Sequence, residues 1–123
     1  MTRPPPDSAL TRAAEALARR RLSPALLNHS YRTYAFGAAL GELENLDVDR
    51  ELLFAAALLR HIGPMTTREV AEQVGLSTAA TDILLTAVTL PHTSGVTLAH
   101  GEVAYLLSAG AGLDVVLVAA CRG

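Results

Sequence analysis

The chain of 123 residues contains no tryptophan, a single cysteine and no lysine, and only 4% of its residues are aromatic. One cysteine, Cys121, excludes a disulfide within the chain and favours a reducing compartment. The scarcity of aromatic residues and β-branched runs argues against an all-β fold, and the abundance of Ala and Leu favours helices. Half of the residues are hydrophobic and the net charge is small, which argues against intrinsic disorder. At this length we expect one domain.

Charge is scarce as well: 18% of the residues are charged and the formal net charge is −2. A slightly negative chain has no global basic field, so we expect no nucleic-acid partner. No apolar run is long enough for a membrane span, and the polar, proline-rich residues 1–6 do not match a signal peptide. We therefore expect a cytoplasmic protein with a flexible arm over 1–6 and one domain over 7–123. So few charges cover apolar surface poorly, and we expect a homodimer.

Apolar residues at helical spacing and capping signals divide the chain into five to six helices. The expected starts are Asp7 or Ser8, Ser23-Pro24, Asp49, a capping box from Thr66 to Glu69, and Ser77. Three alanines at 55–57 would let neighbouring helices approach closely, so their helix is expected to be central. In the last third we expect a helix over 103–109, a turn at glycines 110 and 112, and a short buried helix or strand over 113–120. The predicted fold is a compact all-α bundle.

The four histidines are the first candidates for chemistry, because imidazole binds metals and titrates near neutral pH. They are His29, His61, His92 and His100. None forms a ligand pair spaced i, i+4 on one helix, so a metal site must be assembled from different helices. We interpret His100, beside Gly101, as part of a surface turn.

Four blocks of the sequence resemble HD-domain proteins, in particular the cyanamide-hydratase-like branch. Residues 26–37 (LLNHSYRTYAFG) resemble the first metal-binding helix, and residues 54–63 (FAAALLRHIG) resemble the helix that ends in the family's His-Asp doublet. Residues 87–94 (AVTLPHTS) resemble the next helix, and residues 110–116 (GAGLDVV) the segment with the last aspartate. The resemblance implies an HD-like helical bundle that holds one or two divalent metals. These metals would activate water for the hydrolysis or hydration of a small-molecule substrate.

In this resemblance His29 matches the first ligand and Asp114 the last, while Arg60-His61 stands where the family has His-Asp. An arginine cannot ligate a metal, because its guanidinium has no lone pair to give. His61 can replace the missing carboxylate, so that His29, His61 and Asp114 would hold zinc, iron or manganese with a position open for water. His61 and His92 would then shuttle protons.

Two arginines complete the predicted site. Arg60 would bind an anionic group of the substrate, and Arg32, one turn beyond His29, would point into the same cavity. Simpler interpretations stay open for each residue. Arg60 and His61 can be cations that favour a helix C-terminus, Arg32 can form a surface ion pair, and Asp114 can cap the segment that follows it.

The leading function is metal-assisted hydrolysis or hydration of a small molecule. Its rival is a degenerate HD domain without metal, acting as a metal-free small-molecule enzyme or as a binding or oligomerisation module. A third interpretation comes from residues 67–77, which carry the small residue and the glycine of a helix-turn-helix. The following residues, 78–85, offer no Arg, Asn or Gln to contact base edges, which disfavours DNA binding.

Overall fold

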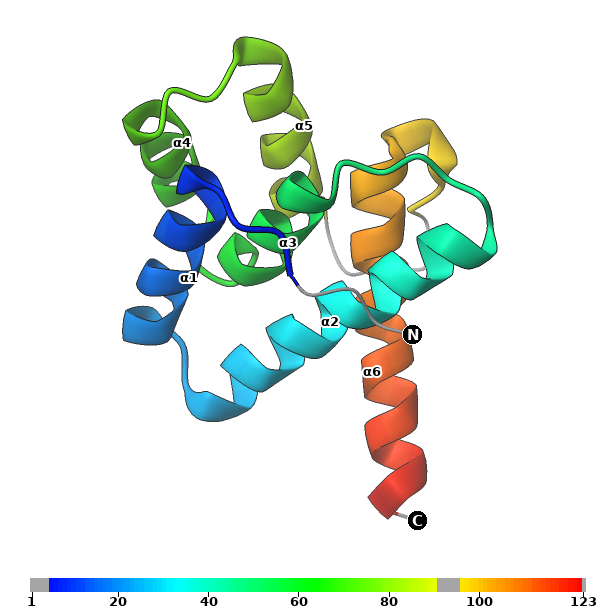
Figure 1. Cartoon of the computed structure of the whole chain (residues 1–123). Helices are drawn as coiled ribbons and strands as arrows, with labels where there is room; N and C mark the ends of the chain where they lie inside the picture. Colours follow the sequence, from blue (N-terminus) through cyan, green and yellow to red (C-terminus); the bar gives the residue numbers. More distant parts are fainter. Residues whose placement is uncertain (1–4, 91–95, 123) are drawn as a thin grey trace.

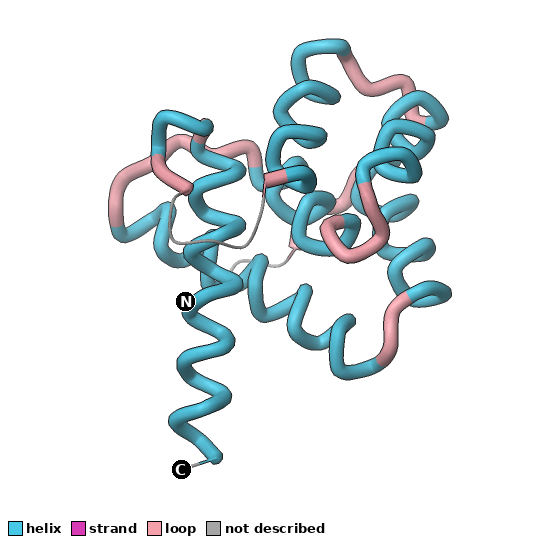
Figure 2. Tube along the Cα trace, turned by 180° about the vertical axis from the view of Figure 1, so that it is seen from behind, coloured by secondary structure: helices cyan, strands magenta, loops and turns pink. Residues whose placement is uncertain are grey.

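The computed structural model describes residues 5–90 and 96–122, and along these two ranges it contains helices and no strand (Figures 1 and 2). The α-helices are α1 (Ala9–Arg21), α2 (Pro24–Leu43), α3 (Arg50–Leu59), α4 (Pro64–Gln73), α5 (Thr78–Thr89) and α6 (Glu102–Arg122). A short 3₁₀-helix, η1 (Leu98–His100), precedes α6. The predicted all-α bundle is confirmed.

Helix α3 forms the centre of the bundle. It packs against α1, α2, α5 and α6, and every residue over 52–59 is buried. A helix that is surrounded on all sides has no polar face, which explains its run of Leu, Phe and Ala. The rings of Phe54 and Tyr34 meet edge to face with centroids 5.1 Å apart. Figure 1 shows α3 in the middle of the bundle, as the alanines at 55–57 predict.

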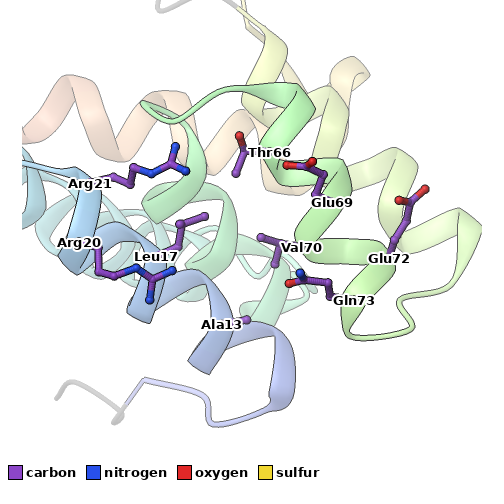
Figure 3. A pocket seen from close by; sticks show the side chains of 9 residues that line it. All are labelled: Ala13, Leu17, Arg20, Arg21, Thr66, Glu69, Val70, Glu72 and Gln73. Atoms are coloured by element: carbon purple, nitrogen blue, oxygen red, sulfur yellow. The ribbon is translucent and has the colours of Figure 1, made fainter.

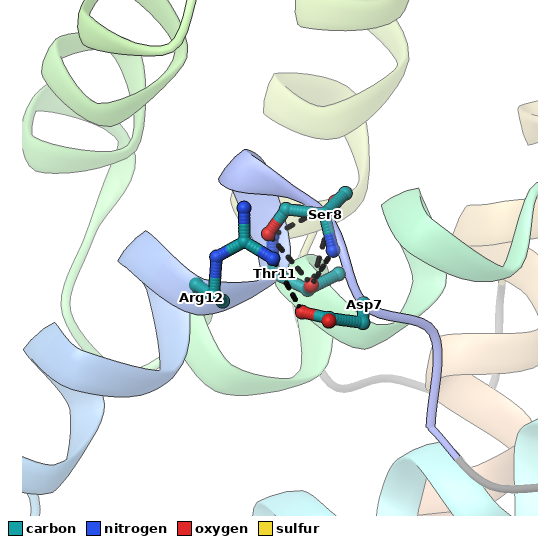
Figure 4. Close-up of polar contacts among 4 residues, drawn as sticks. All are labelled: Asp7, Ser8, Thr11 and Arg12. Atoms are coloured by element: carbon teal, nitrogen blue, oxygen red, sulfur yellow. Dashed lines mark hydrogen bonds and ion pairs between the residues drawn. The ribbon is translucent and has the colours of Figure 1, made fainter.

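Side-chain caps determine where most helices begin. Four caps accept a hydrogen bond from the amide three residues later: Ser8, Ser23, Asp49 and Ser77. Figure 4 shows the first of them, where Ser8 Oγ accepts from the Thr11 amide at 3.2 Å and Arg12 pairs with Asp7 at 2.6 Å. Such a cap contributes about 1 kcal/mol. These four predicted starts are confirmed, with Ser8 rather than Asp7 as the first cap.

The predicted start of α4 is wrong. A capping box from Thr66 to Glu69 is expected, but the helix begins at Pro64, with Gly63 as its N-cap and no side-chain hydrogen bond at the cap. The proline ring already has the φ that a first helical residue needs. Gly63 has a φ of +113°, which residues with a side chain rarely adopt, so the chain turns sharply before the proline.

The prediction for the last third is also wrong. Helix α6 is continuous over Glu102–Arg122, without a turn at its glycines. Gly110 instead lies directly against α2, where an added Cβ would be 2.3 Å from the Thr33 carbonyl oxygen and 2.9 Å from the Gly37 nitrogen. A Cβ on Gly37 would likewise be 2.8 Å from the Leu106 carbonyl oxygen. The pairing of 33 with 110 and of 37 with 106 means that α2 and α6 run antiparallel in close backbone contact.

The second half of α6 is exposed, although a buried segment is expected over 113–120. Its large apolar side chains are 40–63% exposed: Leu113, Val115, Val116 and Leu117. Figure 1 shows this end of α6 projecting from the bundle. The stretch Glu102–Ala120 is long and apolar enough to cross a membrane, a property that buried core helices share, and 39% of it is buried here.

Candidate functional site

The contact between α2 and α6 places one carboxylate among polar partners. Asp114 lies one turn after Gly110 on α6, and its side chain is only 3% exposed. On α2, His29 lies one turn before Thr33, which faces Gly110. Because the two helices are antiparallel, one turn forward on α6 meets one turn backward on α2. The glycine contact therefore brings Asp114 to His29 and Arg32.

Asp114 is held by two side chains of α2. The Nδ1 atom of His29 lies 2.5 Å from Asp114 Oδ2. Arg32 donates from Nε to Oδ1 at 2.5 Å and from Nη2 to Oδ2 at 3.3 Å. The expectation that Asp114 caps a following segment is wrong, because the residue lies in the middle of α6. Arg32 pairs with this buried carboxylate, although its own side chain is 45% exposed.

These hydrogen bonds keep Asp114 ionised. Burial by itself would raise the pKa of this carboxyl, but the hydrogen bond from Arg32, then that from His29, and the charges of both outweigh it. The pKa of Asp114 is therefore below its ordinary value. An ionised carboxylate only accepts hydrogen bonds, so Nδ1 of His29 carries the proton. When His29 is neutral, its Nε2 then has the free lone pair.

A second imidazole lies close by. The ring centroid of His61 is 5.9 Å from that of His29, and the two rings are tilted by 53°. His61 follows the C-cap of α3, so the first predicted ligand and the altered doublet do come together in space. His61 is exposed by its surface area, yet desolvation, then the charge of His29 and that of Arg60, lower the pKa of His61 below its ordinary value. His61 is therefore neutral at pH 7.

Arg60 is the C-cap residue of α3 and is half-buried. Its Nη1 is buried and has no hydrogen-bond partner among the described residues. Burial lowers the pKa of the guanidinium to about 10, so it still carries its charge at neutral pH. A buried polar group without a partner costs about 1–3 kcal/mol, more when charged. Unlike Arg32, Arg60 thus retains hydrogen-bonding capacity that this part of the chain does not use.

The structure describes one of the other two histidines. His100 is exposed in η1, where its Nδ1 accepts from the Thr97 amide at 3.1 Å, so the surface-turn interpretation is confirmed. His92 lies outside the described residues, and its role as a proton shuttle stays a prediction. The two helices of the helix-turn-helix pattern are α4 and α5, and α5 carries no basic residue.

Two of the three metal ligands that the resemblance implies, His29 and Asp114, contact each other in this arrangement. Both carboxylate oxygens of Asp114 accept from side-chain N–H groups, and Nδ1 of His29 is used in one of these contacts. Arg60 adds a positive charge beside His61, which repels a cation. Over the residues with described positions, no three His, Cys, Asp or Glu side chains gather closely enough to hold an ion. The metal set of His29, His61 and Asp114 stays a prediction.

A separate pocket of about 450 Å³, which was not predicted from the sequence, lies between α1 and α4. Figure 3 shows Arg20 and Arg21 on one side and Glu69 and Glu72 on the other, over a floor that includes Leu17. The arginines lie in the last turn of α1, where the helix dipole alone explains them. No sequence motif links these arginines to the α4 carboxylates. The pocket therefore could not be predicted from the sequence alone.

No protein-family model, curated protein or solved structure matches this chain. The likeness to HD-domain proteins therefore stays a resemblance.

Proposed function

We propose that this chain is a metal-free enzyme that performs acid–base chemistry on a small molecule. The observation that carries the proposal is the hydrogen bond of 2.5 Å between His29 Nδ1 and Asp114 Oδ2. A buried carboxylate that holds the Nδ1–H of a histidine orients the ring and stabilises its protonated form. His29 then presents Nε2 as a general base.

The chemistry needs only His29, Asp114 and His61. As a water molecule adds to the substrate, its oxygen forms the new bond and one of its protons passes to Nε2 of His29. The imidazolium is stabilised by Asp114 and afterwards returns the proton to the adduct or to the leaving group. His61, neutral at pH 7 and 5.9 Å away between ring centroids, supplies a second site for the proton. A positioned general base of this kind contributes about 10²–10⁴-fold in rate.

A matched pair of histidine variants tests the proposal. Small nitriles, amides and phosphate esters are screened with the whole chain in the presence of a chelator. For a substrate that is turned over, His29→Gln should lower kcat by about 10²–10⁴-fold, while His100→Gln, which changes an exposed histidine, should keep it. Turnover that His29→Gln leaves unchanged contradicts the proposal.

Metal-assisted hydrolysis or hydration is the second candidate, and the closeness of His29 and His61 favours it. Two imidazoles from different segments of the chain can share an ion through ring nitrogens, with Asp114 as the outer partner that orients His29. The metal-to-protein ratio, measured by plasma mass spectrometry on untagged protein dialysed without chelator, distinguishes the two candidates. A ratio near one supports this metal-dependent alternative. A ratio near zero that added zinc, manganese or iron does not raise supports the metal-free enzyme.

A further inference from the structure

We propose that Arg60 binds an oxyanion, a phosphate or carboxylate group carried by the small-molecule substrate, beside His61. This inference rests on the proposed function and names its substrate class.

The charges around the cluster leave one guanidinium without an anion. Arg32 is paired with the carboxylate of Asp114, at 2.5 Å from Nε to Oδ1. Arg60 forms no ion pair with any described residue, and its Nη1 is buried without a hydrogen-bond partner. Arg60 as a whole is only half-buried, and a half-buried guanidinium without a protein partner can bind an anion from outside.

The planar guanidinium of Arg60 also determines which anions fit. Its N–H groups form a rigid fork that matches the two oxygens of a carboxylate or two of the oxygens of a phosphate. His61 follows it directly in the chain and is 5.9 Å from His29 between ring centroids. An anion on Arg60 would therefore hold the rest of a small substrate near the free Nε2 of His29.

The two predicted substrate-binding arginines thus have different roles. Arg32 is a positioning residue, because it acts on Asp114 and through it on His29. Arg60 is the residue with donors to spare. The sequence treats the two alike, and only the contacts of Asp114 separate them.

Binding of inorganic phosphate and of acetate to the whole chain tests this inference. Both anions are titrated at constant ionic strength and followed by nuclear magnetic resonance of the arginine Nε–H groups and the backbone amides. Arg60→Gln should weaken the binding of the preferred anion by about tenfold or more. Arg68→Gln, which removes the same charge from an exposed position on α4, should change it by less than about twofold. The anion that binds more tightly identifies the substrate group.

The inference is overturned if the wild-type chain binds neither anion, or if Arg60→Gln binds both as the wild type does. If Arg60→Gln does not fold, Arg60→Met, with Arg68→Met as its control, gives the same comparison with the apolar stem kept. His29→Gln separates this inference from the proposed function, because that variant should lose turnover and still bind the anion. Anion binding without any turnover in the wild type would refute the enzyme and leave the anion site standing.

Discussion

His29 Nδ1 lies 2.5 Å from Asp114 Oδ2, although 85 positions separate the two residues in the chain. Arg32 binds the same carboxylate, so a single buried aspartate is the meeting point of two α2 side chains and α6. The contact exists because α2 and α6 approach through glycines. The site and the helix packing therefore depend on each other, and the predictions below separate them.

Replacing the carboxylate should destabilise the fold. Asp114→Asn leaves Arg32 without its anion and places an amide opposite the Nδ1–H of His29. Because Arg32 is 45% exposed and water partly compensates it, we expect a loss of about 2–3 kcal/mol in the free energy of unfolding at pH 7. Urea denaturation measures it, with Asp82→Asn on the exposed side of α5 as the control. Equal stability of both variants would show that the Asp114 contacts contribute nothing.

The same residue should make stability depend on pH. The pKa of Asp114 is lowered in the folded chain, so the unfolded chain takes up this proton at a higher pH than the folded one. The contribution of ionised Asp114 to the free energy of unfolding is complete above the ordinary pKa of about 4. It is lost as the pH falls through the pKa that Asp114 has in the folded chain. The difference in unfolding free energy between the wild type and Asp114→Asn should therefore shrink below about pH 4. A difference that stays constant from pH 7 to pH 3 would contradict the lowered pKa.

Replacing two glycines of α6 by alanine should change the stability of the fold in opposite directions. A Cβ on Gly110 would meet the Thr33 carbonyl oxygen at 2.3 Å, and this backbone atom cannot move aside. Gly110→Ala should therefore cost about 2 kcal/mol or more. A Cβ on Gly112 has no neighbour within 4 Å, so Gly112→Ala should stabilise the helix by about 0.5–1 kcal/mol. Thermal and urea unfolding of both variants check this, and a neutral Gly110→Ala would mean that α2 and α6 are further apart.

His61 should titrate below the ordinary histidine pKa of about 6.5. Desolvation, His29 and Arg60 all disfavour its protonated form in the folded chain. The unfolded chain therefore binds this proton more readily, and the His61 contribution to stability falls as the pH drops from about 6.5 through the folded pKa. Nuclear magnetic resonance titration of the ring measures the midpoint directly. A midpoint at or above 6.5 would contradict the lowered pKa of His61.

The exposed end of α6 tests the expected homodimer. Val116 is 63% exposed, and apart from the buried Asp114 the neighbouring residues of α6 carry no charge, so two copies could pack together without bringing like charges close. We expect light scattering to give a dimer for the wild type and a monomer for Val116→Glu. Thr86→Glu, at an exposed position of α5, adds the same charge and should leave the dimer intact. A monomeric wild type would refute the expectation.

The elements that depend on neighbouring residues could be predicted from the sequence. The caps at Ser8, Ser23, Asp49 and Ser77 are local hydrogen bonds, and the burial of α3 follows from a run without polar residues. The continuity of α6 could not be predicted in this way. Glycine signals a turn when it is considered alone, whereas Gly110 serves the approach of a helix that lies far away in the sequence.

The candidate site was predictable in part. His29 and Asp114 were both expected near one centre, and they do meet, but as a hydrogen-bonded pair. What the sequence could not show is how the carboxylate divides its oxygens between His29 and Arg32, because that depends on the register of α2 against α6. The unused donor of Arg60 is likewise visible only from burial.

The protonation of the His29 ring in the presence of zinc tests the central claim most directly. Nitrogen chemical shifts of His29 are recorded at pH 7 on the labelled chain, before and after one equivalent of zinc. We predict a protonated Nδ1 and a metal-free Nε2 in both spectra. An Nδ1 without its proton, or a shift of Nε2 to a metal-bound value when zinc is added, would contradict the proposal.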